Sequence, residues 1–159
     1  MLNGTDMITG ALNTWLEKNN FTARCGGIEP GFGWNPAQDY IFYSLVITEK
    51  TSQMFYEYTG ELGLKYEIDD FWLAFLHELG HSETWHLVDE EDWDVPIDIS
   101  DYDYYRHPRE AIATEWAVDF INEHSDLVVD LSRIVRPAIC KFFEMNNIEE
   151  GSQCEEKCI

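Results

Sequence analysis

The sequence predicts an α+β protein that is mostly helical and has a small sheet. Several segments carry apolar residues at helical spacing, while residues 40–48 are dense in aromatic and β-branched types. The 159 residues are 45% apolar, which is enough for one core. We therefore expect a single domain over residues 1–159, with its core at about 5–145 and a polar, cysteine-containing tail over 146–159.

The first half of the chain predicts a helix, a loop, a strand and a second helix. Residues 6–18 show helical apolar spacing, with Thr5 as the expected cap. Residues 24–39 hold four glycines and two prolines, which is typical of a loop. Residues 40–48 then form the expected strand, and residues 51–63 the next helix.

The strongest helical segment is residues 71–88. Asp69 and Asp70 precede it, and acidic side chains suit the positive end of a helix dipole. Because the segment is apolar on most sides, we expect it to be a central, buried helix.

The second half predicts a loop and two more helices. Residues 89–106 are acidic and form the expected loop. Pro108 suits the first turn of a helix that continues to about residue 123. The last helix begins near Ser125 and is expected to be interrupted at Pro137, since proline cannot donate a backbone hydrogen bond.

The net charge of −21 argues against one class of function. Such a surface repels nucleic-acid phosphates, so we expect no nucleic-acid partner. Solubility alone is the favoured interpretation of this charge, and attraction of a basic protein or peptide substrate is the alternative. No stretch resembles a signal peptide or a membrane span, which predicts a cytoplasmic protein without a membrane partner. The sequence does not indicate an oligomeric state.

The four cysteines are too few for a disulfide scaffold. They are Cys25, Cys140, Cys154 and Cys158, three of them within the last twenty residues. Free thiols are the favoured interpretation, and a C-terminal disulfide or other oxidation is the alternative.

One motif carries specific chemistry: His77-Glu78-Leu79-Gly80-His81 has the form HExxH and lies in the predicted central helix. Residues four apart share a helix face, so both imidazoles can reach one Zn²⁺ ion. Glu78 is offset by one position, so it can instead approach a water molecule and act as a general base. Two surface histidines are the plain alternative, but the apolar neighbours make a surface location unfavourable, and unpartnered imidazoles in a core would be costly.

A catalytic zinc ion needs a third protein ligand and an open position. Glu115 is the preferred candidate, because Asp119 lies one turn later and could orient a metal-bound imidazole. Glu110 is the alternative third ligand, although a first-turn glutamate could simply stabilise the helix dipole. His86 and His107 are further candidates, with His86 expected to line the cleft.

Peptide hydrolysis also needs a donor to the developing oxyanion. The candidates include a cluster just before the Glu115 helix: Tyr102, Tyr104, Tyr105, Arg106 and His107. A packed aromatic loop is an equally good interpretation for any one of them. An extended substrate could lie along the edge of the strand at 40–48.

These motifs resemble the ImmA/IrrE family of metallopeptidases and, more loosely, minimal gluzincins. The resemblance covers about residues 40–124 and includes the HELGH motif, His86, and a later helix with Glu115-x-Ala117-x-x-Phe120. It implies a minimal zincin-like fold, a zinc ion held by His77, His81 and Glu115, and Glu78 as catalytic base. In that family the substrate is often a regulatory protein, and members are common in bacteria, phages and mobile elements. The run after Ala117 departs from the family pattern, and no helix-turn-helix module is evident.

The sequence therefore predicts a zinc-dependent peptidase. A non-enzymatic zincin-like module is the first alternative; if phage encoded, it could be virion-associated. An acidic inhibitor with an accidental HExxH motif is the second alternative. A fourth protein ligand would favour a structural metal, and an open position would favour an enzyme.

Overall fold

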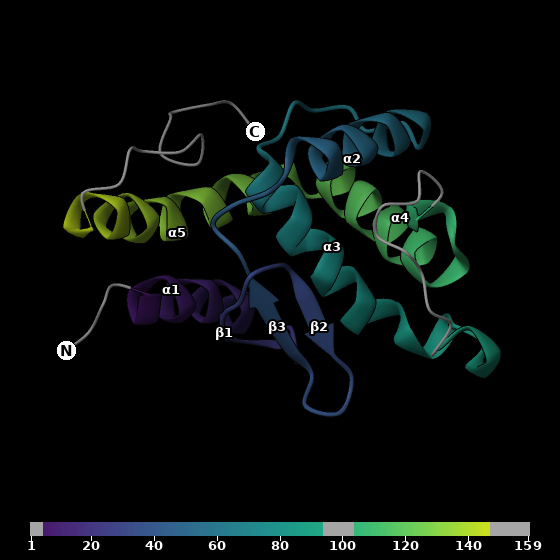
Figure 1. Cartoon of the computed structure of the whole chain (residues 1–159), viewed down its shortest axis with the longest axis horizontal. Helices are drawn as coiled ribbons and strands as arrows, with labels where there is room; N and C mark the ends of the chain where they lie inside the picture. Colours follow the sequence, from purple (N-terminus) through teal and green to yellow (C-terminus); the bar gives the residue numbers. More distant parts are fainter. Residues whose placement is uncertain (1–4, 94–103, 147–159) are drawn as a thin grey trace.

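The computed structural model describes residues 5–93 and 104–146 (Figure 1). Within them lie five α-helices and one small sheet, which confirms the mostly helical α+β prediction. The principal elements are α1 (Thr5–Lys18), β1 (Arg24–Ile28), β2 (Gly33–Asn35), β3 (Tyr40–Tyr43), α2 (Glu49–Glu61), α3 (Asp70–Thr84), α4 (Pro108–Glu123) and α5 (Ser125–Met145). The 3₁₀ turns are η1 (Trp85–Leu87), η2 (Glu90–Asp92) and η3 (Tyr104–Arg106).

The sheet has the order β1-β3-β2, with β1 parallel and β2 antiparallel to β3. The prediction that residues 24–39 form a loop is therefore wrong for Arg24–Ile28 and Gly33–Asn35, which form strands β1 and β2. Its glycines serve packing: a Cβ at Gly26 would lie 3.0 Å from the ring of Phe42. Gly27 sits at an irregularity in the ladder with φ of +144°, which favours glycine.

β3 is shorter than expected and central in the sheet. It ends at Tyr43, and the Ser44 hydroxyl then bonds to both the backbone N–H and C=O of Val46, which turns the chain out of the sheet. Because β3 is paired on both sides, it cannot supply the predicted free edge. That edge belongs to β2, which packs against α3.

Helix α3 crosses the middle of the molecule, with the sheet on one side and α2 and α4 on the other (Figure 1). The Asp69 side chain caps it by accepting from the backbone N–H of Phe71. Every residue from Phe71 to His81 is buried. Burying side chains such as Phe75 and Leu76 stabilises the fold by about 1.5–3 kcal/mol each. The packing of this helix therefore fixes the position of the backbone that carries His77, Glu78 and His81.

Helix α3 ends at Thr84, earlier than the predicted residue 88, and η1 follows. The Thr84 hydroxyl donates to the carbonyl of Gly80. Residues 94–103 of the predicted acidic loop lie outside the described residues, and so does Tyr102 of the predicted aromatic cluster.

Helix α5 continues past Pro137, so the predicted interruption is wrong. Pro137 is exposed, which leaves the carbonyl that would have bonded to it facing water. The opposite face packs against α1, and its buried residues include Val128, Leu131, Val135 and Ile139. The burial of that face outweighs one missing hydrogen bond.

The two cysteines within the described residues differ. Cys25 carries a free, buried thiol, whereas Cys140 is disulfide-bonded, so the free-thiol prediction is wrong for Cys140. The predicted tail lies almost wholly outside the described residues, which end at Asn146. Of the helices that the structure describes, none has both the length and the apolar character that crossing a membrane requires.

Candidate metal centre

Two imidazoles on α3 and one carboxylate on α4 converge on a single point. His77 and His81 are one turn apart, and the Nε2 atom of each lies 3.1 Å from Oε1 of Glu110. All three side chains are buried. Two helices therefore bring together two imidazoles and a carboxylate, a set of three ligands that catalytic zinc ions commonly take.

Thr114 fixes the orientation of His77. Its hydroxyl donates to the carbonyl of Glu110 at 3.0 Å and lies 2.9 Å from Nδ1 of His77. Because a hydroxyl has only one proton to donate, it accepts from the Nδ1–H of His77. This arrangement leaves Nε2 as the ring atom that faces Glu110, and it is the nitrogen available to a metal ion.

The charges at this point are strongly coupled. Burial alone would raise the pKa of the Glu110 carboxyl, but the hydrogen bonds to His77 and His81 outweigh it and hold that pKa well below its usual range. Burial also acts to lower the pKa of His81, yet its hydrogen bond to Glu110 leaves that pKa raised. Glu110 is thus a carboxylate that requires a cation beside it, whether protons or a metal ion.

The spacing of the donor atoms fits one metal ion. Two ligands on a tetrahedral zinc ion, each about 2.1 Å from it, lie roughly 3.4 Å apart. The observed distance of 3.1 Å from Oε1 to each Nε2 is close to that value. The ligand atoms of His77, Glu78 and His81 also lie within 4.8 Å of one another, so this buried group could hold a metal ion.

Glu78 and Glu110 have different surroundings, which favour different chemical roles for the two carboxylates. Glu110 is bonded to both histidines and lines one of two hollows beside them, whereas Glu78 lines both hollows. Burial raises the pKa of Glu78, partly offset by the nearby imidazoles. A carboxylate that reaches the hollows and binds protons readily suits proton transfer better than metal ligation.

Arg109 occupies the second oxygen of Glu110. Its Nε donates to Oε2 at 3.0 Å, and its Nη1 donates to the carbonyl of Trp93 at 2.8 Å. With Oε2 engaged, Glu110 presents Oε1 alone to the histidines. This contact favours ligation through one oxygen, which helps to leave a coordination position open for a substrate or water.

Two tyrosines from η3 complete the centre. Tyr104 lines both hollows together with Glu78. Tyr105 stacks on Phe55 at 4.2 Å between ring centroids and meets the ring of His77 edge-on. Burial, with the nearby carboxylates, raises the pKa of both phenols, so each hydroxyl keeps its proton and remains a potential donor.

The structure does not bring Glu115 or Asp119 to this centre, because both are exposed on the outer side of α4. The buried positions of α4 include Glu110, Ala113 and Ala117, at the helical intervals of three and four. Glu115 falls off that face and instead lies near Tyr58, whose pKa it helps to raise together with burial. The small residues Ala113 and Ala117, which share the helix face of Glu110, are the sequence signal that could have identified it.

The remaining predicted cleft residues lie elsewhere. His86 is exposed on η1, and neither His86 nor His107 lines the two hollows. His107 instead precedes α4, where its carbonyl accepts from the N–H of Ala111. Of the predicted oxyanion candidates, Tyr104 and Tyr105 are the ones that border a hollow.

Sequence reasoning missed a support on the far side of His81. The indole of Trp34 stacks on the His81 ring, with an interplanar angle of 11°. Asp39 holds that indole by accepting from its Nε1 at 2.8 Å, and it also accepts from Ser82 at 2.6 Å. Both residues were assigned to a loop, so no signal connected them with the motif on α3.

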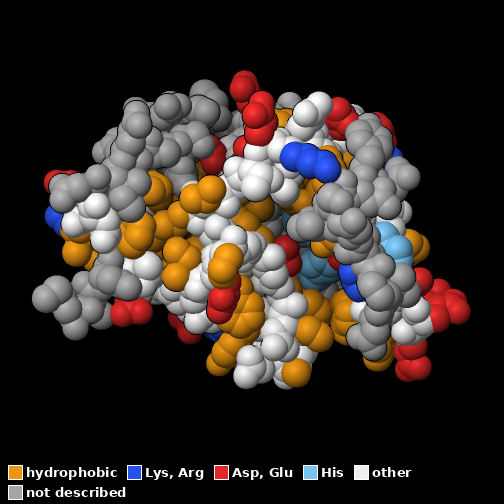
Figure 2. All heavy atoms as spheres, in the orientation of Figure 1, with side chains coloured by type: hydrophobic (Ala, Val, Ile, Leu, Met, Phe, Trp, Pro, Cys, Tyr) orange, Lys and Arg blue, Asp and Glu red, His pale blue; other side chains and the backbone are white. Residues whose placement is uncertain are grey.

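The centre lies between two hollows. Figure 2 shows histidine and acidic side chains at the bottom of a depression on this face. The first, the apolar hollow, has a volume of about 200 Å³, and its lining includes Pro30, Phe32, Val46, Ile47, Phe55 and Ala74. The second, the tryptophan hollow, measures about 330 Å³, and its lining includes Trp34, Trp85, Trp93 and Arg109. The centre is therefore accessible from outside on both sides of Glu78.

Comparison with protein-family models, with curated proteins and with solved structures found none that matches this chain. The functional argument therefore depends on the geometry of this centre.

Proposed function

We propose that the protein is a zinc-dependent peptidase in which His77, His81 and Glu110 hold the ion and Glu78 is the general base. The observation that carries the proposal is the convergence of both Nε2 atoms on one oxygen of Glu110, beside a Glu78 that lines both hollows. Three protein ligands, with the second Glu110 oxygen held by Arg109, are the pattern of a catalytic rather than a closed structural site.

When bound, a zinc ion would polarise a peptide carbonyl and lower the pKa of a water molecule. Glu78 accepts a proton from that water as the oxygen attacks the carbonyl carbon. The C–N bond then breaks, and Glu78 passes the proton to the leaving amine. The second proton of the water also reaches the amine, so the products are a carboxylate and an ammonium group, and one water molecule is consumed for each bond cleaved.

Two further parts of the chain support the same chemistry. Tyr104 lies at the junction of the hollows with a protonated hydroxyl, where it can donate to the carbonyl oxygen as negative charge develops. β2 is an edge strand whose residues Gly33 and Trp34 line the tryptophan hollow. An extended peptide can lie along such an edge, with its backbone held by main-chain hydrogen bonds.

We further infer membership of the ImmA/IrrE-like metallopeptidases, with one change in the expected ligands. Support comes from the HELGH motif on a buried helix and from a carboxylate on the following long helix. Glu110 takes the ligand position that the resemblance gave to Glu115. The net charge of −21 favours a basic protein or peptide substrate.

The test is hydrolysis of fluorescently labelled casein, which offers many different peptide bonds. We expect the zinc-loaded protein to cleave it, a chelator to abolish cleavage, and one equivalent of Zn²⁺ to restore it. Cleavage that persists after verified removal of the metal would contradict the proposal. A fully metal-loaded protein that cleaves neither casein nor a mixed peptide library would instead favour a metal-binding module without activity.

A further inference from the structure

We infer that the apolar hollow is a specificity site that binds a bulky apolar side chain next to the cleaved bond. This inference rests on the proposed peptidase function and adds the class of substrate. The hollow begins at the reacting groups, since His77 and Glu78 form part of its lining. A peptide carbonyl at the metal centre would therefore place one of its two neighbouring side chains in this hollow.

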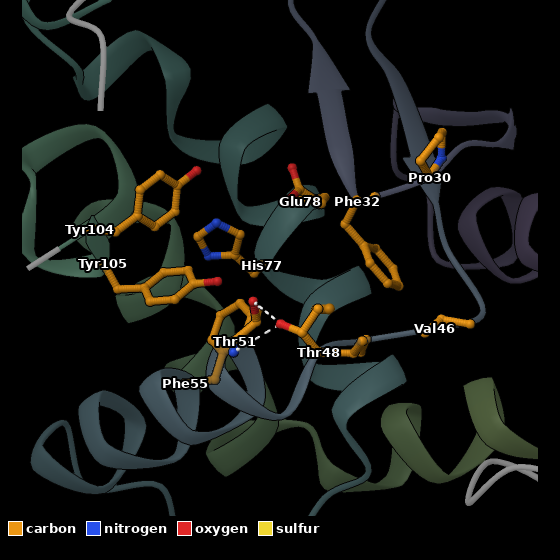
Figure 3. Close-up of a pocket in the computed structure, with 13 residues that line it drawn as sticks. Pro30, Phe32, Val46, Thr48, Thr51, Phe55, His77, Glu78, Tyr104 and Tyr105 are labelled. Atoms are coloured by element: carbon orange, nitrogen blue, oxygen red, sulfur yellow. Dashed lines mark hydrogen bonds between the residues drawn. The ribbon is translucent and has the colours of Figure 1, made fainter. Parts of the chain in front are cut away.

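The chemistry of the walls selects apolar groups. Figure 3 shows Phe32 and Val46 on one side of the hollow, and Tyr104 and Tyr105 on the other. Two threonines in its lining bond to each other: the Thr48 hydroxyl donates to the Thr51 hydroxyl at 2.9 Å and accepts from the backbone N–H of Thr51. Because the Thr48 hydroxyl is already paired, it offers little compensation to a polar side chain that leaves water.

The size of the hollow sets the upper limit of the side chain. An apolar protein cavity of about 150 Å³ is large enough to bind benzene. The apolar hollow measures about 200 Å³, so a leucine, methionine or phenylalanine side chain fits. Glu78 at its inner end would repel an aspartate or glutamate side chain.

The rim also indicates a binding role. Val46 is 77% exposed, which is more than any other large apolar residue that the structure describes as exposed. It stands directly at the mouth of the hollow, on the segment where Ser44 turns the chain away from β3. A peptide side chain in the hollow would cover it, as is typical of exposed apolar residues at ligand-binding grooves.

Two substitutions change the hollow at residues that are not part of the proposed metal centre. Ala74 lies one turn before Glu78 on α3 and lines the hollow, so Ala74→Leu places a larger side chain in it. Val46→Asp puts a negative charge on the exposed rim, where it cannot disturb the core. The matched control is Met145→Asp, another exposed apolar residue, at the end of α5 and outside the lining of both hollows.

The experiment is cleavage of a randomised peptide library by the zinc-loaded protein, with the products identified by mass spectrometry. We expect leucine, methionine or phenylalanine at one position beside the cleaved bond, preferred over alanine by at least roughly tenfold in kcat/KM. Ala74→Leu should move the preference to alanine and glycine, Val46→Asp should weaken it at least severalfold, and Met145→Asp should leave it unchanged. Cleavage without such a preference, or a preference that survives both hollow variants, overturns the inference and leaves the peptidase proposal intact.

A binding measurement keeps the inference testable without hydrolysis. Acetyl-Gly-Phe-Gly-amide and acetyl-Gly-Ala-Gly-amide are titrated separately into metal-free protein and followed by NMR chemical shifts. The phenylalanine peptide should bind at least roughly tenfold more tightly and shift the signal of the Ala74 methyl group. Equal affinities would overturn the inference. The phenylalanine preference without hydrolysis of any library peptide would support the binding site and contradict the peptidase proposal.

Discussion

Replacing Glu78 with glutamine is expected to lower the rate of peptide hydrolysis by about 10²–10⁴-fold while the protein keeps its metal ion. Glutamine has the same shape as glutamate but cannot accept the proton of the attacking water. Burial raises the pKa of Glu78, which means that its ionised form costs free energy in the fold. Glu78→Gln should therefore leave the melting temperature unchanged or slightly higher. The measurement combines kcat/KM on a labelled peptide with elemental analysis and thermal unfolding.

The matched control is Glu115→Gln, which alters an exposed glutamate on α4. It should retain wild-type hydrolysis, metal content and stability. A Glu78→Gln protein that holds its metal ion and still hydrolyses peptides at the wild-type rate would contradict the role of Glu78 as general base.

Replacing Gly80 with alanine is expected to destabilise the fold and weaken metal binding together. A Cβ at Gly80 would lie 2.4 Å from the backbone oxygen of Ala113, and neither helix backbone can move without repacking the core. Helix α4 would have to shift away from α3, and Glu110 would move with it. We expect a loss of about 1–3 kcal/mol in the free energy of unfolding and at least roughly tenfold weaker zinc binding.

Whether Gly80→Ala lowers or raises the free energy of unfolding distinguishes a steric clash between the two helices from the effect of helix propensity. Propensity alone predicts that alanine in place of a helical glycine stabilises by about 1 kcal/mol. Gly10→Ala on α1 is the control, because Gly10 is exposed and a Cβ there would meet nothing within 4 Å. It should stabilise the protein and leave zinc binding unchanged. A Gly80→Ala protein that gains stability as Gly10→Ala does would show that the two helices are not packed as described.

Local sequence patterns predicted the parts of the fold that depend on interactions between residues close in the sequence. The apolar spacing around His77 and the acidic residues before it identified a buried helix and its start, and Pro108 marked the start of α4. Proline and glycine predicted the wrong secondary structure at positions where packing outweighs local propensity. Gly26 is a strand residue beneath an aromatic ring, and Pro137 continues inside a helix whose other face is firmly buried.

The choice of α4 carboxylate shows why the centre could be predicted only in part. Two candidate ligands on one helix follow from a spacing of four residues, but the third candidate depends on how a second helix is rotated against the first. Glu110 and Glu115 are five residues apart, so only one of them can face α3. Gly80 and Ala113 set that rotation through a close backbone contact, which involves residues 33 apart in the sequence.

The most direct test of the central claim is the metal content of three proteins purified without added metal and then titrated with Zn²⁺: the wild type, Glu110→Ala and Glu115→Ala. We predict about one zinc ion per chain in the wild type and in Glu115→Ala, and strongly weakened or absent binding in Glu110→Ala. Circular dichroism would verify that all three are folded. Zinc retained in Glu110→Ala with wild-type affinity, or lost in Glu115→Ala, would contradict a centre built from His77, His81 and Glu110.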